Sequence, residues 1–253
     1  MKPEHWRAWW EKQKTNSPGA LPGRPDLPPA AETGKKDPKK QDEDRYGPGP
    51  KYYGIEIYSS RIGFVLDTSL SMDTLFEPDP RIVAALSRTY TGQTKLQICK
   101  EEVSQTLRTL HPQSHFSLIV FNTRIQSFKK NPIPSSPGNL QSAESWLRNL
   151  PPAGETNYYD GLRAALDLEE GQLDDSPNFR STPDTLTFLT DGMPTQGEIT
   201  DSDTLLEWYT SINRYARIRT HVVAFGSKGV DIVLLRGMAE RNAGRFVHVM
   251  ERE

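Results

Sequence analysis

The turn that follows residues 61–66 carries Asp67, Ser69 and Ser71 at alternate positions. Residues 62–66 contain no charge and are mostly apolar, which predicts a fully buried strand of the kind found in parallel sheets. Carboxylate and hydroxyl oxygens on one short loop are the ligands that hard divalent cations prefer. The turn therefore indicates a candidate cation site at the end of a buried strand.

Two further oxygen-bearing residues occupy comparable places in the sequence. Thr156 lies in a glycine-containing loop just before an expected helix, and Asp191 directly follows an apolar run at 185–190. Each feature alone has an ordinary explanation, because such residues are common in turns and as helix N-caps. Ligands gather at the carboxyl ends of the strands in open α/β sheets, so the joint occurrence of the three features favours one shared site.

The elements that position these residues alternate along the chain. We expect a strand over 52–58, joined to the next by a tight turn near Ser59 and Ser60 and lying beside it. Apolar runs predict further strands over 61–67, 115–121, 185–190, 220–226 and 245–249, and helical spacing predicts helices over 94–110, 139–150, 201–217 and 230–241, with another after Thr156. This alternation predicts an α/β fold with a doubly wound, mostly parallel sheet covered by helices on both faces.

The first 50 residues differ from the rest of the chain. Nine of the 20 prolines lie there, and the tract is rich in glycine and lysine, which predicts a disordered linker ahead of a folded domain at 52–253. Trp6, Trp9 and Trp10 share one face of a helical turn. We interpret them as a docking face, either for the chain's own domain or for a partner or a missing N-terminal domain.

Composition excludes several classes of function. A net charge of −2 argues against a nucleic-acid binder that depends on bulk positive charge. The single cysteine, Cys99, excludes an internal disulfide and is expected in the core. No segment is long and apolar enough to span a membrane and the N-terminus lacks a signal-peptide core, so we expect a cytoplasmic protein. His221 and His248 lie within strand patterns and are expected to be structural.

The three oxygen-bearing segments together resemble the von Willebrand factor A domain family. FVLDTSLSM is similar to the family's DxSxS turn, GETNYYDGL to its threonine loop and FLTDGMPT to its second aspartate turn. The resemblance covers Tyr52 to about Val249, and DIVLLRGMAERNAGRFVHV is similar to the family's last helix and strand. Leu70 departs from the pattern, because many members have glycine there.

The resemblance implies a Rossmann-like fold and a metal-ion-dependent adhesion site that binds Mg²⁺, with Mn²⁺ or Ca²⁺ as alternatives. The implied ligands are Asp67, Ser69, Ser71, Thr156 and Asp191. An open coordination position would accept an Asp or Glu side chain of a protein partner, with Leu70 at the rim. Asp73 and Asp160 are expected to be solvated surface residues or to orient ligands and waters.

Other functions are open to the same residues. Some members of the family serve as accessory subunits of ATPases or chelatases. A metal-dependent phosphohydrolase is a weaker alternative, since the chain has Ser69 where a haloacid-dehalogenase-like enzyme needs a second acid. The sequence has no GxSxG elbow, Walker motif or metal-spaced histidine pair. We therefore expect a non-catalytic interaction module.

Overall fold

The computed structural model describes residues 49–86, 88–167 and 183–252. The strands are β1 (Lys51–Tyr52), β2 (Ile55–Glu56), β3 (Arg61–Asp67), β4 (His115–Phe121), β5 (Ile125–Ser127), β6 (Ile133–Pro134), β7 (Thr185–Thr190), β8 (Arg219–Phe225) and β9 (Phe246–Val249). The helices are the 3₁₀ turn η1 (Leu70–Asp73), α3 (Pro80–Leu86), α4 (Lys95–Arg108), α5 (Pro137–Arg148), α6 (Tyr158–Ala165), α7 (Ser202–Ala216) and α8 (Ile232–Glu240).

Among the described strands, β3 to β9 form a mostly parallel sheet in the order β5-β4-β3-β7-β8-β9, with β6 also paired to β4. Strands β4, β3, β7, β8 and β9 are parallel to their neighbours, while β5 and β6 run antiparallel to β4. The chain builds outward from β3 to β4 and then returns to β7 on the other side of β3. Strand order therefore reverses between β3 and β7, where open α/β sheets place their ligands.

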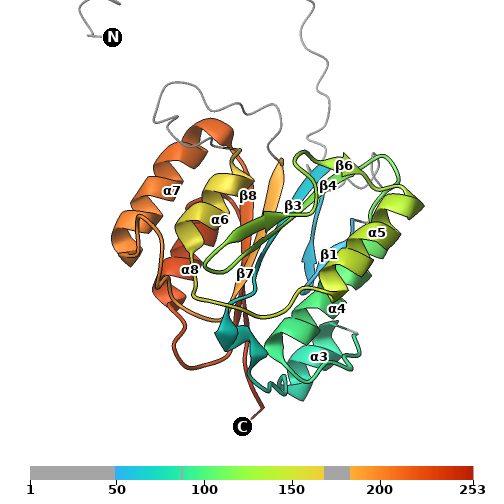
Figure 1. Cartoon of the computed structure of the whole chain (residues 1–253), viewed down its shortest axis with the longest axis horizontal. Helices are drawn as coiled ribbons and strands as arrows, with labels where there is room; N and C mark the ends of the chain where they lie inside the picture. The colour runs from blue at the N-terminus through green and yellow to red at the C-terminus, as the bar shows by residue number, and fades with distance from the viewer. Residues whose placement is uncertain (1–48, 87, 168–182, 253) are drawn as a thin grey trace, which may run out of the picture. The chain divides into compact units, whose positions relative to one another are not determined.

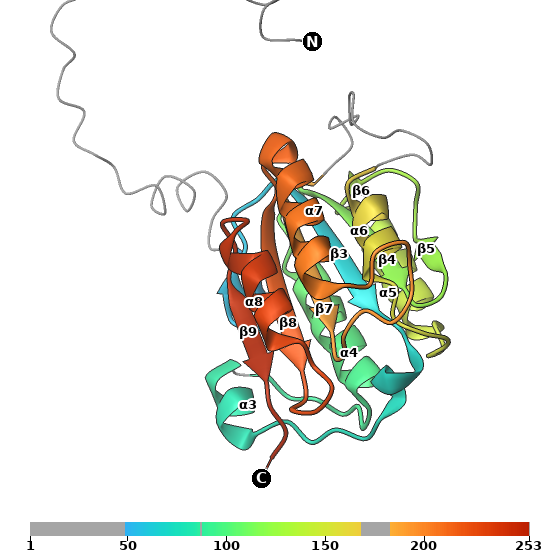
Figure 2. The same ribbon diagram turned by 90° about the vertical axis from the view of Figure 1, so that its left-hand side faces the viewer.

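Helices cover both faces of this sheet, as the sequence predicts (Figures 1 and 2). Strand β3 shows why, because its side chains alternate between two hydrophobic clusters. Phe64 and Leu66 pack in the cluster that contains α4 and α5, whereas Val65 packs in the cluster that contains α6, α7 and α8. Cys99 of α4 is fully buried in the first cluster, as expected for a core residue.

The predicted strand beside β3 is wrong. Residues 51–56 form a separate antiparallel hairpin, β1-β2, while β3 pairs with β4 and β7. Tyr53 and Gly54 both have positive φ angles, which is typical of the two-residue turns that close hairpins. The alternation of apolar and polar residues predicted a strand there, but such a pattern does not identify the partner strand.

The other predicted elements agree with the structure to within about three residues, and their ends have local causes. Helix α4 begins after Thr94, whose hydroxyl accepts a hydrogen bond from Gln97 N while the Gln97 side chain reaches back to Thr94 N, a capping box. Helix α7 is capped by Asp201, whose side chain accepts a hydrogen bond from Thr204 N. Residues 132–138, just before the helix predicted over 139–150, are partly regular, because they contain β6 and the first residues of α5.

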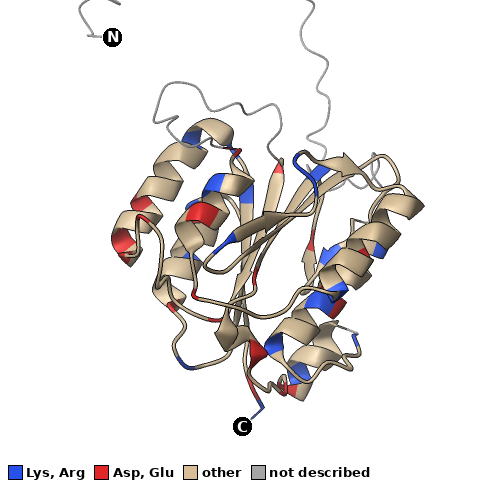
Figure 3. Ribbon diagram, viewed as in Figure 1, with Lys and Arg blue, Asp and Glu red and all other residues tan. Residues whose placement is uncertain are grey.

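Positions of basic and acidic residues are interspersed along the helices of the ribbon in Figure 3. None of the described helices combines the length and the apolarity needed to cross a bilayer.

Candidate functional site

Asp67 ends β3 and is held in place on both sides. Its Oδ1 accepts a hydrogen bond from Ser69 N (2.8 Å), and its Oδ2 accepts one from Thr190 Oγ1 (2.6 Å). The Tyr158 hydroxyl lies 2.9 Å from Thr190 Oγ1 and links α6 to the end of β7. A carboxylate fixed by two donors keeps its orientation without help from solvent.

Asp67 is fully buried, and this burial raises the pKa of its carboxyl to about 7. The hydrogen bonds from Thr190 and Ser69 oppose the increase, while the nearby charge of Asp191 adds to it. A positive charge close to Asp67 would stabilise its ionised form.

Ser71 joins the turn after β3 to the turn after β7. Its Oγ donates to Asp191 Oδ1 (2.7 Å) and lies 3.0 Å from Ser69 Oγ. Ser69 and Asp191 are buried, whereas Ser71 is exposed on η1. Two carboxylates and two hydroxyls are thus gathered where strand order reverses.

Thr156 approaches from a third segment, the loop before α6. Gly154 in this loop has φ +67°, and a Cβ there would lie 2.4 Å from Thr123 Oγ1, so the close packing requires glycine. Its carbonyl accepts a hydrogen bond from Leu70 N (3.1 Å), which ties the loop to η1.

The alternative that Thr156 is only a helix cap is wrong. Asn157 caps α6 instead, through a hydrogen bond from Asp160 N to its Oδ1 (3.0 Å). In the described part of the chain the Thr156 hydroxyl makes no hydrogen bond, while its backbone N donates to Thr195 Oγ1 (3.0 Å). The Thr156 side-chain oxygen is therefore available to a ligand.

A cleft with a volume of about 650 Å³ opens above these residues. It is lined by Ser69, Ser71, Thr156 and Asp191 of the predicted set, and by Leu75, Met193, Lys228 and Glu251 among others. Two large apolar residues of the lining are exposed, Leu75 by 73% and Met193 by 48%, and Leu70, which lies in sequence between the lining residues Ser69 and Ser71, is 62% exposed. We call Leu70, Leu75 and Met193 the apolar rim.

The cleft also contains a charge that the sequence analysis missed. Lys95, the first residue of α4, is 7% exposed and donates from its Nζ to Asp191 Oδ2 at 2.8 Å. A lysine at the start of a helix ordinarily signals only a solvated surface position. One signal was available in the sequence. Lys95 begins the first long helix after the Asp67 turn, and the start of that helix lies near the carboxyl end of β3.

A cation at this cleft would meet a chemically suitable set of donors. Within residues 49–86, 88–167 and 183–252, no group of three or more His, Cys, Asp or Glu side chains is placed to hold a metal ion. The donors that do converge are carboxylate and hydroxyl oxygens, the ligands of a hard divalent cation rather than of a thiophilic one.

The family model for the von Willebrand factor type A domain matches residues 82–248, about two thirds of the chain. The chain belongs to this family. The matched range includes Thr156 and Asp191 but begins after the turn that carries Asp67, Ser69 and Ser71.

Known relatives and structures of the von Willebrand factor A (vWA) domain agree. Inter-alpha-trypsin inhibitor heavy chain H1 from Mesocricetus auratus is 30% identical over 184 residues, which are 73% of this chain and 19% of that protein. The chain thus spans about a fifth of the curated relatives it first matches. The von Willebrand factor type A structure from Catenulispora acidiphila has a TM-score of 0.56 at 15% identity, over 76% of this chain and 38% of the other.

A second solved structure is that of proximal thread matrix protein 1 from the mussel byssus, with zinc in its metal-ion-dependent adhesion site (MIDAS) motif. It has a TM-score of 0.50 at 19% identity, over 75% of this chain and 41% of the other. At these identities the likeness shows the fold of the vWA domain.

The remaining predicted residues of the vWA domain fall outside the cleft lining. Asp73 is exposed, and Asp160 accepts a hydrogen bond from Asn157 Nδ2 (2.7 Å), so it orders the threonine loop. His221 accepts from Arg245 N through its Nδ1 (3.0 Å), and His248 Nε2 lies 2.6 Å from Gly226 O, as expected for structural residues. Trp6, Trp9, Trp10 and the linker lie outside the described residues.

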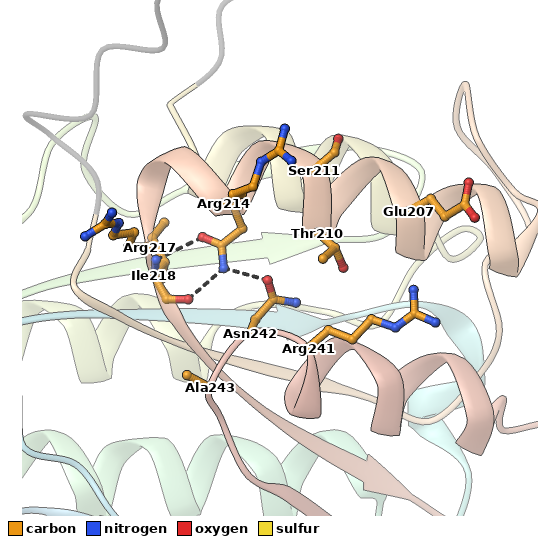
Figure 4. Close-up of a pocket in the computed structure, with 10 residues that line it drawn as sticks. Glu207, Thr210, Ser211, Arg214, Arg217, Ile218, Arg241, Asn242 and Ala243 are labelled. Carbon is orange, nitrogen blue, oxygen red and sulfur yellow. Dashed lines mark hydrogen bonds between the residues drawn. The ribbon is translucent and has the colours of Figure 1, made fainter.

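The vWA domain has another hollow, of about 580 Å³, between the ends of α7 and α8 (Figure 4). The buried Asn213 and Asn242 line it and are joined by a hydrogen bond from Asn213 Nδ2 to Asn242 Oδ1 (2.8 Å). Arg214, Arg217 and Arg241 line it, but their guanidinium groups point in different directions. This arrangement does not form an anion site.

Proposed function

We propose that this vWA domain binds a divalent cation, Mg²⁺ in the first place, on Asp67, Ser69, Ser71, Thr156 and Asp191. Through the cation it would capture an acidic side chain of a protein partner. The observation that carries the proposal is the hydrogen-bonded group Asp67–Ser69–Ser71–Asp191, with the unpaired Thr156 hydroxyl at the same cleft.

The chemistry of the donors supports capture rather than catalysis. Hydroxyl ligands are neutral, so a divalent cation held by few carboxylates stays incompletely neutralised and attracts an external carboxylate. When bound, the cation supplies this electrophilic contact. The chain's own residues fix its place, because Ser71 bridges the two turns and Gly154 ties the threonine loop to η1.

The apolar rim supports a protein as the ligand. Leu70, Leu75 and Met193 surround a charged centre, which suits an acidic side chain that is flanked by apolar residues on the partner. vWA domains are typically protein-interaction modules. In proximal thread matrix protein 1 a zinc ion occupies the MIDAS motif, so the same fold holds a divalent cation elsewhere.

No particular contact among the described residues favours either alternative function, that of an accessory subunit of an ATPase or chelatase or that of a phosphohydrolase. The expected cytoplasmic location and the division into a tail at 1–50 and a domain at 52–253 stay predictions.

Isothermal titration of Mg²⁺ and Mn²⁺ tests the cation site. The variants are Ser71→Ala and Thr156→Val, each of which removes one hydroxyl, and the control is Ser211→Ala, an exposed hydroxyl on α7 at the distant hollow. We expect the wild type and Ser211→Ala to bind equally and each site variant to bind at least about fivefold more weakly. Equal binding by all four proteins would overturn the assignment of these ligands.

A further inference from the structure

Lys95 places a fixed positive charge inside the proposed cation site. Its Nζ lies 2.8 Å from Asp191 Oδ2, and Ser71 Oγ occupies the other oxygen, Asp191 Oδ1, at 2.7 Å. The side chains of Lys95 and Asp191 are 8% and 1% exposed. Solvent therefore screens this ion pair far less than it would a surface pair.

The surrounding chain holds Lys95 in this position. Its backbone N donates to Thr74 O (3.2 Å), and the Thr94 capping box fixes the start of α4. A Cβ at Gly226 would lie only 3.3 Å from Lys95 Nζ and 3.5 Å from Glu251 Oε1, so the glycine leaves space for both side chains. The ammonium is thus a built part of the cleft.

A buried ammonium beside proposed metal ligands changes the charge that a cation would meet. Without Lys95 the site offers two carboxylates, Asp67 and Asp191, which together balance one divalent cation. With Lys95, the two carboxylates, the ammonium and a divalent cation carry one net positive charge. The exposed Lys228 and Glu251 also line the cleft, and their opposite charges leave this sum unchanged. Like charges in a poorly solvated site repel strongly, so the cation binds less tightly and an added carboxylate binds more tightly.

We propose that Lys95 sets the affinity and the ligand dependence of the cation site, an inference that builds on the proposed function. Its ammonium competes with the metal ion for Asp191 and keeps the affinity for the cation alone low. It also leaves the site with a net positive charge once a divalent cation is bound. The metal and an acidic ligand therefore bind cooperatively. Lys95 is a positioning residue here, acting through Asp191.

The test is a titration of Mn²⁺ into the full chain and its variants, followed by isothermal calorimetry. Lys95→Gln keeps a hydrogen-bond donor without the charge, Lys95→Met removes both, and Lys95→Arg keeps the charge. The matched control is Lys228→Gln, which removes an exposed charge from the lining of the same cleft. Thermal unfolding of each variant without metal verifies that it folds.

We expect Lys95→Gln and Lys95→Met to bind Mn²⁺ at least about tenfold more tightly than the wild type, and Lys228→Gln and Lys95→Arg to stay within about threefold of it. Repeating the titration in acetate, with the ionic strength matched by chloride, should strengthen Mn²⁺ binding by the wild type more than by Lys95→Gln.

Two outcomes would count against the proposal and differ in what they overturn. If folded Lys95→Gln and Lys95→Met bind Mn²⁺ no more tightly than the wild type, Lys95 does not set the affinity, while the cation site stands. If neither the wild type nor these variants bind Mn²⁺ at millimolar concentration, the proposed function fails and the role of Lys95 fails with it.

Discussion

The two ends of the sheet both bury polar side chains, but they satisfy them differently. At the amino end of β8, the Asn213 amide bonds to both backbone groups of Ile218 and to Asn242, whose Nδ2 donates to Met238 O (2.7 Å). At the carboxyl ends of β3 and β7, the buried groups are charged, and they are joined by hydroxyls and by Lys95.

This difference separates a structural network from a candidate binding site. Neutral amides that pair with backbone groups leave nothing for a ligand, even though a hollow of about 580 Å³ lies beside them. Of the charged groups held by hydroxyls and one lysine, Asp191 and Lys95 line an open cleft, where the proposed cation would exchange with these partners. The two hollows differ little in volume, about 580 and 650 Å³, so the state of the polar groups that line them is what tells them apart.

The largest effect is expected at the carboxyl end, from loss of the buried ion pair. Lys95→Met leaves the Asp191 carboxylate buried without its cation, so the free energy of unfolding in the presence of a chelator should fall by about 3 kcal/mol. Urea unfolding measures this. Mn²⁺ should then raise the free energy of unfolding of Lys95→Met by more than that of the wild type, because the metal replaces the missing positive charge. Equal stabilisation of both proteins by Mn²⁺ would contradict this comparison of the two ends.

A somewhat smaller effect is expected at the amino end, from loss of the amide network. Asn213→Leu removes both bonds to Ile218 and leaves its buried backbone N–H without the Asn213 acceptor, so we expect a loss of about 2 kcal/mol by urea unfolding. Ser211→Ala, two residues away on α7, is the control and should change stability by less than about 0.5 kcal/mol. Mn²⁺ should not restore Asn213→Leu; selective recovery would mean that the two ends are coupled.

Most of the fold and only part of the site could be predicted from the sequence. The apolar runs predicted β4 and β7 with the bounds that the structure shows, because an apolar run between polar turns has few other interpretations. The pairing of β1 with β2 was missed, since alternation identifies a strand without its partner. Lys95 was missed because burial and an ion pair to a residue 96 positions away arise only when α4 is laid across the sheet.

Acid should weaken the amino end of the sheet through His221. Burial, and to a lesser degree Arg219 and Arg245, lower the pKa of His221 to about 4 from 6.5. The unfolded chain therefore binds the extra proton first, so the stability from neutral His221 is complete above pH 6.5 and is lost as the pH falls toward 4.

By about pH 5 the expected loss is about 2 kcal/mol, and His221→Gln should show a correspondingly flatter pH profile in chelator. The difference between the two profiles isolates His221 from the other titrating groups. Parallel profiles would mean that His221 has the same pKa in the folded and the unfolded protein, which would contradict the prediction.

The smallest effect on the domain itself is expected at the apolar rim. Leu75 and Met193 are too exposed to contribute much to the core, so Leu75→Ser with Met193→Ser should change the free energy of unfolding by less than about 0.5 kcal/mol. Mn²⁺ affinity should stay within about twofold, because neither residue offers a ligand oxygen. A loss of more than about 1 kcal/mol would mean that these side chains pack on their own domain. If the free energy of unfolding does not change, the fold does not need this apolar surface around the charged centre. An exposed apolar surface without a structural role is the property expected of a surface that meets a partner.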